Sequence, residues 1–277
     1  MHPDPHLGAA TRRRDPATRI PWPVGVLAAL GVALFLLPLL GLLQRAEWSR
    51  LWDDLSTPGA RDALRLSLEC SLWATLCSVL LGVPLAWVLA RGTFPGRALL
   101  RALVLLPMVL PPVVGGVALL YAFGRSRGLV GPWLFDTFGL QLTFSKTGVV
   151  LAETFVAMPF LVLTVEGGLR ALDHRYEEAA ATLGAGRWTT FRRVTLRFLA
   201  PSLAAGAALA WARALGEFGA TITFAGNVAG RTQTTPLAVY LLLETQPGAA
   251  VALSLVLLAV SAVVLVALRD RWFGFRR

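Results

Sequence analysis

Residues 173–197 read DHRYEEAAATLGAGRWTTFRRVTLR, a polar stretch with a long apolar segment on either side. Residues 147–169 precede it and residues 198–225 follow it. A helix needs about 20 apolar residues to cross the hydrocarbon layer of a membrane, because that layer is roughly 30 Å thick and each residue rises about 1.5 Å. Both flanking segments reach this length. The sequence therefore predicts a loop that joins two membrane-spanning helices.

Four more apolar segments of similar length lie elsewhere in the chain, and the composition agrees with a membrane environment. Hydrophobic residues make up 56% of the chain and charged residues only 15%, against roughly 25% charged residues in an average soluble domain. We expect a basic, proline-rich tail over residues 1–21 and one transmembrane domain over residues 22–277. The predicted fold class is an all-α integral membrane protein with six transmembrane helices, at about residues 22–43, 63–90, 102–124, 147–169, 198–225 and 247–268.

The distribution of Lys and Arg between these segments predicts the orientation of the chain. Basic residues close to helix ends stay on the cytoplasmic side of the membrane. With the N-terminus inside, the inner loops and termini hold roughly twice as many Lys and Arg residues as the outer loops. We therefore expect both termini and the loop 173–197 to be cytoplasmic.

The loop itself has the pattern of two short helices. Asp173 is a plausible N-cap for the first, which carries Glu177 and Glu178 in its first turn and alanines in its middle. Gly184 can end it in a left-handed conformation. A second helix is expected from about Arg187. Its apolar residues fall three or four positions apart and give one apolar and one basic face; they are Trp188, Phe191 and either Val194 or Thr195.

Such a hairpin could simply rest on the membrane surface as an amphipathic element. The order of its residues favours a second interpretation. Glu178-Ala179-Ala180, three residues, Gly184, nine residues and Val194-x-Leu196 resemble the E-A-A-x-x-x-G, nine residues, I-x-L-P loop of ABC importer permeases. Val194 stands at the isoleucine position of that pattern, and Arg197 stands where the family has proline.

This resemblance implies a type I ABC importer permease fold in which the loop 173–197 holds a coupling helix that docks in a cleft of an ATPase subunit. The docking residues would be Glu177, Glu178, Ala179, Ala180 and Gly184. The family also implies two ATP-binding subunits, a second permease copy that forms a homodimer, and a periplasmic or lipid-anchored oxyanion-binding protein. The expected location is the bacterial inner membrane, in contact with lipid.

The chain lacks the sequence of an ATP site. A phosphate-binding loop reads G-x-x-x-x-G-K-[ST], whereas the only lysine, Lys146, follows Ser145. We therefore expect ATP and Mg²⁺ to bind the partner ATPase, and no catalytic, cofactor or metal residue in this chain. The net charge of +10 could indicate a nucleic-acid partner, but no polar segment is long enough for a reading domain.

Several further blocks resemble molybdate permeases. They lie at residues 91–100, 106–115, 182–188, 212–227 and 232–240. Sulfate and thiosulfate permeases are near relatives with similar blocks, so the resemblance implies an oxyanion, with molybdate or tungstate favoured and sulfate the alternative. An ion-coupled secondary transporter would also use broken helices and intramembrane charges, but it has no use for the pattern from Glu178 to Gly184.

Candidate pathway residues lie inside the third and fifth segments. Pro111 and Pro112 should kink or break the third helix, which fits a bent packing helix and a pathway lining equally well. In the fifth, Arg213 and Glu217 are four residues apart and can pair; an internal ion pair is favoured over contact with an anion. Polar side chains near the outer end of the same segment could offer donors to a passing oxyanion: Thr221, Thr223 and Asn227. Glu69, Glu153 and Glu166 lie nearer segment ends, where solvation is expected.

Overall fold

The computed structural model describes residues 21–273, so the predicted tail lies outside it apart from Pro21. The chain divides into two compact units, residues 1–45 and 46–277. The described part of the first unit contains α1 (Trp22–Gln44), which begins with a proline in its first turn and buries no side chain. Its length and apolar composition suffice to cross a membrane, as the sequence predicts.

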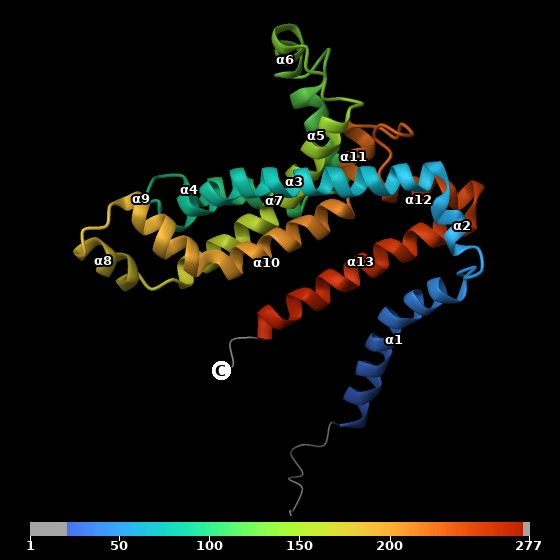
Figure 1. Ribbon diagram of the computed structural model, residues 1–277, viewed down its shortest axis with the longest axis horizontal. Helices are drawn as coiled ribbons and strands as arrows, with labels where there is room; N and C mark the ends of the chain where they lie inside the picture. The colour runs from blue at the N-terminus through green and yellow to red at the C-terminus, as the bar shows by residue number, and fades with distance from the viewer. Residues whose placement is uncertain (1–20, 274–277) are drawn as a thin grey trace, which may run out of the picture. The chain divides into compact units, whose positions relative to one another are not determined.

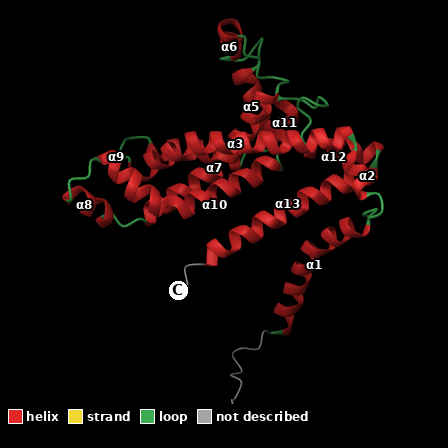
Figure 2. Ribbon diagram, in the orientation of Figure 1, coloured by secondary structure: helices red, strands yellow, loops and turns green. Residues whose placement is uncertain are grey.

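The described part of the second unit consists of helices joined by loops and contains no strand (Figure 2). Its elements are α2 (Leu51–Ser56), α3 (Pro58–Arg91), α4 (Arg97–Leu105), a 3-10 turn η2 (Leu106–Met108), α5 (Pro112–Phe123), α6 (Gly131–Phe138), α7 (Lys146–Ala171), α8 (Arg175–Thr182), α9 (Arg187–Thr190), a π turn η3 (Phe191–Thr195), α10 (Leu196–Leu215), α11 (Gly219–Phe224), α12 (Thr235–Thr245) and α13 (Pro247–Phe273).

Helices α3, α7 and α10 pack together as the centre of this unit (Figure 1). Their shared core contains Leu89, Leu161, Val165 and Leu169, all fully buried. Small residues allow the close approach: a Cβ on Gly82 of α3 would lie 2.8 Å from the Leu161 side chain, and one on Gly168 of α7 would lie 2.7 Å from Cβ of Ser202. Small residues at helix contacts are typical of membrane bundles, where van der Waals packing drives association.

Within residues 21–273, five helices are long and apolar enough to cross a membrane, and a sixth span results if one bent pair is counted as a unit. The bent pair is residues 97–108 and 112–123, whose axes differ by 115°. Helices long enough for five of the six expected spans are therefore present, and the third expected span corresponds to this bent pair. Pro111 and Pro112 lie at the break. They interrupt the helix because proline supplies no backbone donor and clashes with the preceding turn.

The fifth segment differs most from the expectation. A continuous helix over residues 198–225 is wrong: α10 ends at Leu215, and the short α11 begins at Gly219. On its other side α10 continues without a break from α9 through the π turn, so the helix begins at Arg187. The separate second helix predicted for the loop is thus the first two turns of the fifth span. Helices α2, α6 and α12 were not predicted either.

The contact between α7 and α10 can be tested with two adjacent glycines. A Cβ on Gly168 would collide with Ser202, whereas one on Gly167 would meet nothing within 4 Å. Both changes to alanine favour the helix by about 1 kcal/mol, but overpacking at Gly168 costs about 1–3 kcal/mol. We expect Gly168→Ala to lower the thermal midpoint of the detergent-solubilised protein relative to Gly167→Ala, measured by loss of the monodisperse peak on heating. Equal midpoints would contradict this packing.

Candidate functional site

The loop 173–197 folds as a hairpin, and Gly184 ends its first helix. Gly184 has φ +83°, so the predicted left-handed conformation is confirmed. The Gly184 N–H donates to the Ala181 carbonyl and the Ala185 N–H donates to the Ala180 carbonyl, each at 3.0 Å. This pair of bonds is the Schellman motif, which satisfies carbonyls at a helix end. A side chain with a Cβ would be strained at this position.

The start of α8 differs by one residue from the expectation. The N-cap is His174, which makes no side-chain capping bond. The carboxylate of Asp173 instead accepts from the backbone N–H of Arg175 at 3.0 Å, so Asp173 still satisfies one free donor of the first turn. The two acids that follow complement the positive end of the helix dipole.

Glu177 faces the body of the protein. Its Oε1 accepts from the hydroxyl of Thr195 at 2.7 Å, and its Oε2 lies 3.4 Å from Nη2 of Arg91 at the end of α3. The Glu177 side chain is 20% exposed, and His174 adds contacts to both Glu177 and Arg91. Glu177 therefore ties α8 to α3 and to the π turn, a role that the sequence analysis did not identify.

The remaining predicted docking residues lie nearer the surface. Glu178, Ala179 and Gly184 are exposed, and Ala180 is half-buried. Next to them, Leu183 is 88% exposed and Trp188 is 71% exposed. A carboxylate, small residues and two large apolar side chains are thus exposed on the hairpin.

The second arm of the hairpin is held against α3. The ring of Phe191 packs edge-on against Trp87, with centroids 5.1 Å apart, and Thr195 is fully buried beneath α8. Arg197 occupies the position where the family pattern has proline, and the helix continues through it into α10. The second arm of the hairpin, from Arg187, and the fifth span therefore form one continuous helical element.

The breaks in the third and fifth segments meet each other. Gly219, the first residue of α11, lies so close to α5 that a Cβ there would be 2.7 Å from Cβ of Pro112. One turn further along α5, a Cβ on Gly116 would lie 2.7 Å from Cβ of Thr223 and 2.8 Å from the carbonyl of Ala220. The two interrupted helices thus pack backbone to backbone, with glycine at each close approach.

Arg213 and Glu217 form the ion pair that the sequence favoured. Nη1 of Arg213 lies 2.5 Å from Oε2 of Glu217, and the Glu217 side chain is 1% exposed. The other carboxylate oxygen, Oε1, accepts from the backbone N–H of Ala220 at 2.8 Å. Glu217 thus neutralises the arginine and caps the first turn of α11 across the break.

The three polar candidates at the end of the fifth segment lie close to this junction. Thr223 donates to the carbonyl of Gly219 at 2.8 Å. Thr221 is fully buried. Within the described residues, its Oγ1 has no hydrogen-bond partner, nor does the buried Oδ1 of Asn227. Polar atoms buried without partners are uncommon and often mark functional positions.

Two carboxylates assigned to solvent are in fact buried. Glu153 and Glu166 are each 1% exposed, so the expectation of solvation is wrong for both. Glu166 pairs with Arg170 at 2.6 Å and Arg101 at 3.3 Å, because a buried charge needs partners. Glu69 is partly exposed and pairs with Lys146. Across residues 21–273, no group of three or more His, Cys, Asp or Glu side chains could hold a metal ion.

Comparison with known proteins assigns the chain to a family. The family model for the binding-protein-dependent transport system inner membrane component matches residues 79–274. The chain belongs to this family. The match covers the hairpin and both interrupted helices, and it makes the protein a membrane-spanning component of a transport system.

Curated relatives of this permease agree with the family match. It is 49% identical to the molybdenum transport system permease protein ModB of Mycobacterium bovis, over 92% of this chain and 96% of that protein. It is 44% identical to ModB of Escherichia coli, over 76% of this chain and 92% of that protein. The sulfate transport system permease protein CysT of Escherichia coli is 39% identical over 88% of this chain and 89% of its own length.

Among solved structures, the permease is similar to a chain of a bacterial ABC transporter involved in the import of the acidic polysaccharide alginate. The TM-score is 0.72 at 16% sequence identity, covering 92% of this chain and 96% of that chain. At this identity the likeness concerns the fold alone. It confirms the predicted ABC importer permease fold.

One pair of variants distinguishes the structural role of Glu177, which bonds to Thr195 and Arg91, from the role of the exposed Glu178. Glu177→Ala removes the bonds to Thr195 and Arg91, whereas Glu178→Ala changes only an exposed side chain. Because a hydrogen bond to a charged group contributes about 1.5–3 kcal/mol, we expect amide exchange in α8 to accelerate roughly tenfold in Glu177→Ala. Hydrogen exchange mass spectrometry measures this, and equal exchange in the two variants would contradict the tie.

The pair at the fifth-segment break predicts a non-additive response. Arg213→Gln should leave the carboxylate of Glu217 buried without a counter-charge and destabilise the permease by about 3–5 kcal/mol. Adding Glu217→Gln removes that charge while keeping an acceptor for Ala220, so the double variant should be more stable than Arg213→Gln alone. Thermal unfolding of the solubilised protein measures both. A double variant at least as unstable as Arg213→Gln would show that the pair does not act as a unit.

Proposed function

We propose that this permease carries molybdate, and also tungstate, across the bacterial cytoplasmic membrane as the membrane subunit of an ATP-driven importer. The observation that carries the proposal is the 49% identity to a molybdenum permease over 92% of the chain. The sulfate permease of Escherichia coli is less similar, at 39%. Sulfate is the second candidate because both ions are tetrahedral dianions and the two families share sequence blocks.

The partners follow from the family and from the surface of the hairpin. The hairpin offers a partner the carboxylate of Glu178 in α8, Leu183 at the end of that helix and Trp188 in α9, all exposed. We infer that this surface docks on a separate ATPase subunit, which binds ATP and Mg²⁺, while this chain holds no ATP site. The complete importer would contain two ATPase subunits, two copies of this permease and an oxyanion-binding protein outside the membrane.

The same proposal places the hairpin and both chain termini in the cytoplasm, in keeping with the distribution of basic residues. ATP binding would bring the two ATPase subunits together and move the hairpins with them. The motion would reach the α5–α11 junction through α10, because the second arm of the hairpin continues into α10 and α8 is bound to that arm through Glu177 and Thr195. Opening and closing at that junction would admit the anion, with Thr221, Thr223 and Asn227 as candidate contacts.

The substrate is tested by ATP hydrolysis in liposomes that hold the permease and its ATPase. The binding protein is added loaded with molybdate, tungstate, sulfate or no anion. We expect molybdate and tungstate to stimulate hydrolysis and to enter the vesicles, because the permease is more similar in sequence to the molybdenum permeases than to the sulfate permease of Escherichia coli. Stimulation by sulfate in preference to molybdate would assign the permease to the sulfate group instead.

The docking role of the hairpin is tested by introducing an aspartate at Gly184 and, in a separate variant, two residues further along at Gly186. Gly184→Asp places a charged side chain at φ +83°, a conformation that favours glycine, and disturbs the end of α8. Gly186→Asp adds the same charge at the N-cap of α9, where aspartate is favoured, and no atom lies within 4 Å of its Cβ position. We expect Gly184→Asp to abolish copurification with the ATPase and Gly186→Asp to retain it. Equal loss in both variants would indicate that charge, not helix geometry, decides docking.

A further inference from the structure

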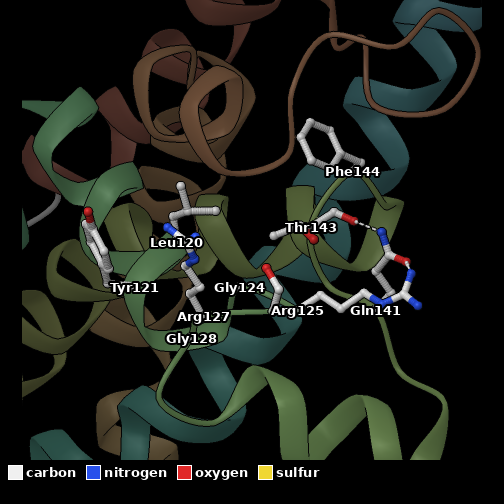
Figure 3. Close-up of a pocket in the computed structure, with 10 residues that line it drawn as sticks. Leu120, Tyr121, Gly124, Arg125, Arg127, Gly128, Gln141, Thr143 and Phe144 are labelled. Atoms are coloured by element: carbon white, nitrogen blue, oxygen red, sulfur yellow. Dashed lines mark hydrogen bonds between the residues drawn. The ribbon is translucent and has the colours of Figure 1, made fainter.

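A basic hollow lies at the C-terminal end of α5 (Figure 3). It has a volume of about 420 Å³ and is lined by the end of α5, the turn that follows it and residues 141–144. Two arginines line it, Arg125 and Arg127, and no carboxylate does. The hydroxyls of Tyr121, Ser126 and Thr143 also border it. The distribution of basic residues places this turn on the outer side of the membrane.

Arg125 is held in position before any ligand binds. Its guanidinium carbon lies 3.8 Å from the ring centroid of Phe135 in α6, and its Nη1 donates to Oε1 of Gln141 at 3.2 Å. Gln141 is oriented in turn, because its Nε2 donates to the carbonyl of Thr143 at 3.2 Å. A guanidinium has five N–H donors, so most of those of Arg125 remain available for a ligand.

Arg127 forms no ion pair with any residue in the described part of the chain. No carboxylate there lies within ion-pair distance of Arg127 or Arg125. Figure 3 shows Arg127 rising beside Leu120 and Tyr121, while Arg125 extends toward Gln141. Two guanidinium groups that flank a hollow with no acid attract an anion, and a tetrahedral oxyanion can accept paired N–H donors from each.

The hollow borders the junction of the two interrupted helices. Phe144, which lines it, has φ 55°, a left-handed conformation that costs a non-glycine residue about 1–2 kcal/mol. In that conformation its ring lies 2.8 Å from the position of a Cβ on Gly226, directly before Asn227. Leu120 lines the other side, one helical turn beyond Gly116 and its contact with Thr223. The wall of the hollow is thus built on the loop that follows α11.

We propose that this hollow is the first site on the permease to receive the oxyanion, between its release by the binding protein and its entry at the α5–α11 junction. The proposal rests on the proposed function and names the part of the chain that meets the substrate first. The ligand class is a tetrahedral dianion: molybdate, tungstate or sulfate. Because both arginines are exposed to water and salt, the site binds weakly and releases the anion readily.

The test uses proteoliposomes that contain the permease with its ATPase, supplied with binding protein loaded with molybdate. The variants are Arg125→Gln, Arg127→Gln and the double variant, with Arg125→Lys and Arg127→Lys as versions that keep the charge. Arg231→Gln is the matched control, because Arg231 is exposed in another outer loop and does not line the hollow. Three quantities are measured: molybdate uptake, ATP hydrolysis, and the affinity of the complex for the binding protein.

We expect the double glutamine variant to reduce molybdate uptake about tenfold, since hydrogen bonds from charged donors to the anion are lost. ATP hydrolysis and affinity for the binding protein should stay within about twofold of the unmodified complex, as should every quantity in Arg231→Gln. The lysine variants should retain most of the uptake, because a lysine still presents a charge to the anion.

Three results would overturn the site. Unchanged uptake in the double variant would show that no anion needs these arginines. A parallel fall in affinity for the binding protein would show that they hold a carboxylate of that protein, and an equal loss in Arg231→Gln would show only a general effect of outer charge. If the unmodified complex imports no oxyanion at all, the proposed function itself fails, whatever the variants do.

Discussion

Inside a membrane every backbone N–H and C=O group must find a partner within the protein, because hydrocarbon offers none. This permease breaks two of its spanning helices and meets the requirement by placing the breaks together. Pro112 supplies no donor at the start of α5, and the carboxylate of Glu217 accepts the N–H of Ala220 at the start of α11. Glycines at positions 116 and 219 let the two backbones touch. Irregular backbone at membrane depth is tolerated where protein covers it or where it lines a cavity, which agrees with the pathway proposed at this junction.

The spans were predictable because their signal is simple. Apolar runs of the length of the bilayer define α1, α3, α7 and α13 to within a few residues at most ends, although α3 begins five residues before the predicted start. The break in the third span was also predictable, since consecutive prolines mark it. The break in the fifth was not, because Gly216, Glu217 and Phe218 occur in intact helices as well. Short helices such as α12 are not predicted because their apolar run is too short to identify a membrane span and no longer than that of an ordinary buried helix.

In the candidate site, too, features set by neighbouring residues could be predicted from the sequence, and features set by residues distant in the sequence could not. The left-handed turn at Gly184 follows from the residues beside it, so the sequence predicts it. Glu177 and Glu178 are neighbours of the same type, and nothing local indicates that one faces the protein and the other faces solvent. Their difference depends on Arg91, which comes 86 positions earlier at the end of α3, and on Thr195 in the π turn. The burial of Glu153 and Glu166 also could not be predicted from neighbouring residues, because it depends on how the helices pack.

The geometry of α10 explains how a docking surface and a distant pathway can act together. From Arg187 to Leu215 the chain is one helical element of 29 residues, about 43 Å long at 1.5 Å per residue. One end is fixed to α8 by Thr195 and Glu177, and the other stops at the break beside Arg213 and Glu217. Under the proposed function, any displacement of the hairpin would be carried along this helix and absorbed where the helix ends. The residues able to absorb it are Gly216 to Phe218, which connect α10 to α11. Glu217 in this connection is buried and bound to Arg213 of α10 and to the N–H of Ala220 in α11. These bonds join the end of α10 to the start of α11, so under the proposed function a displacement of α10 would reach the α5–α11 contact through them.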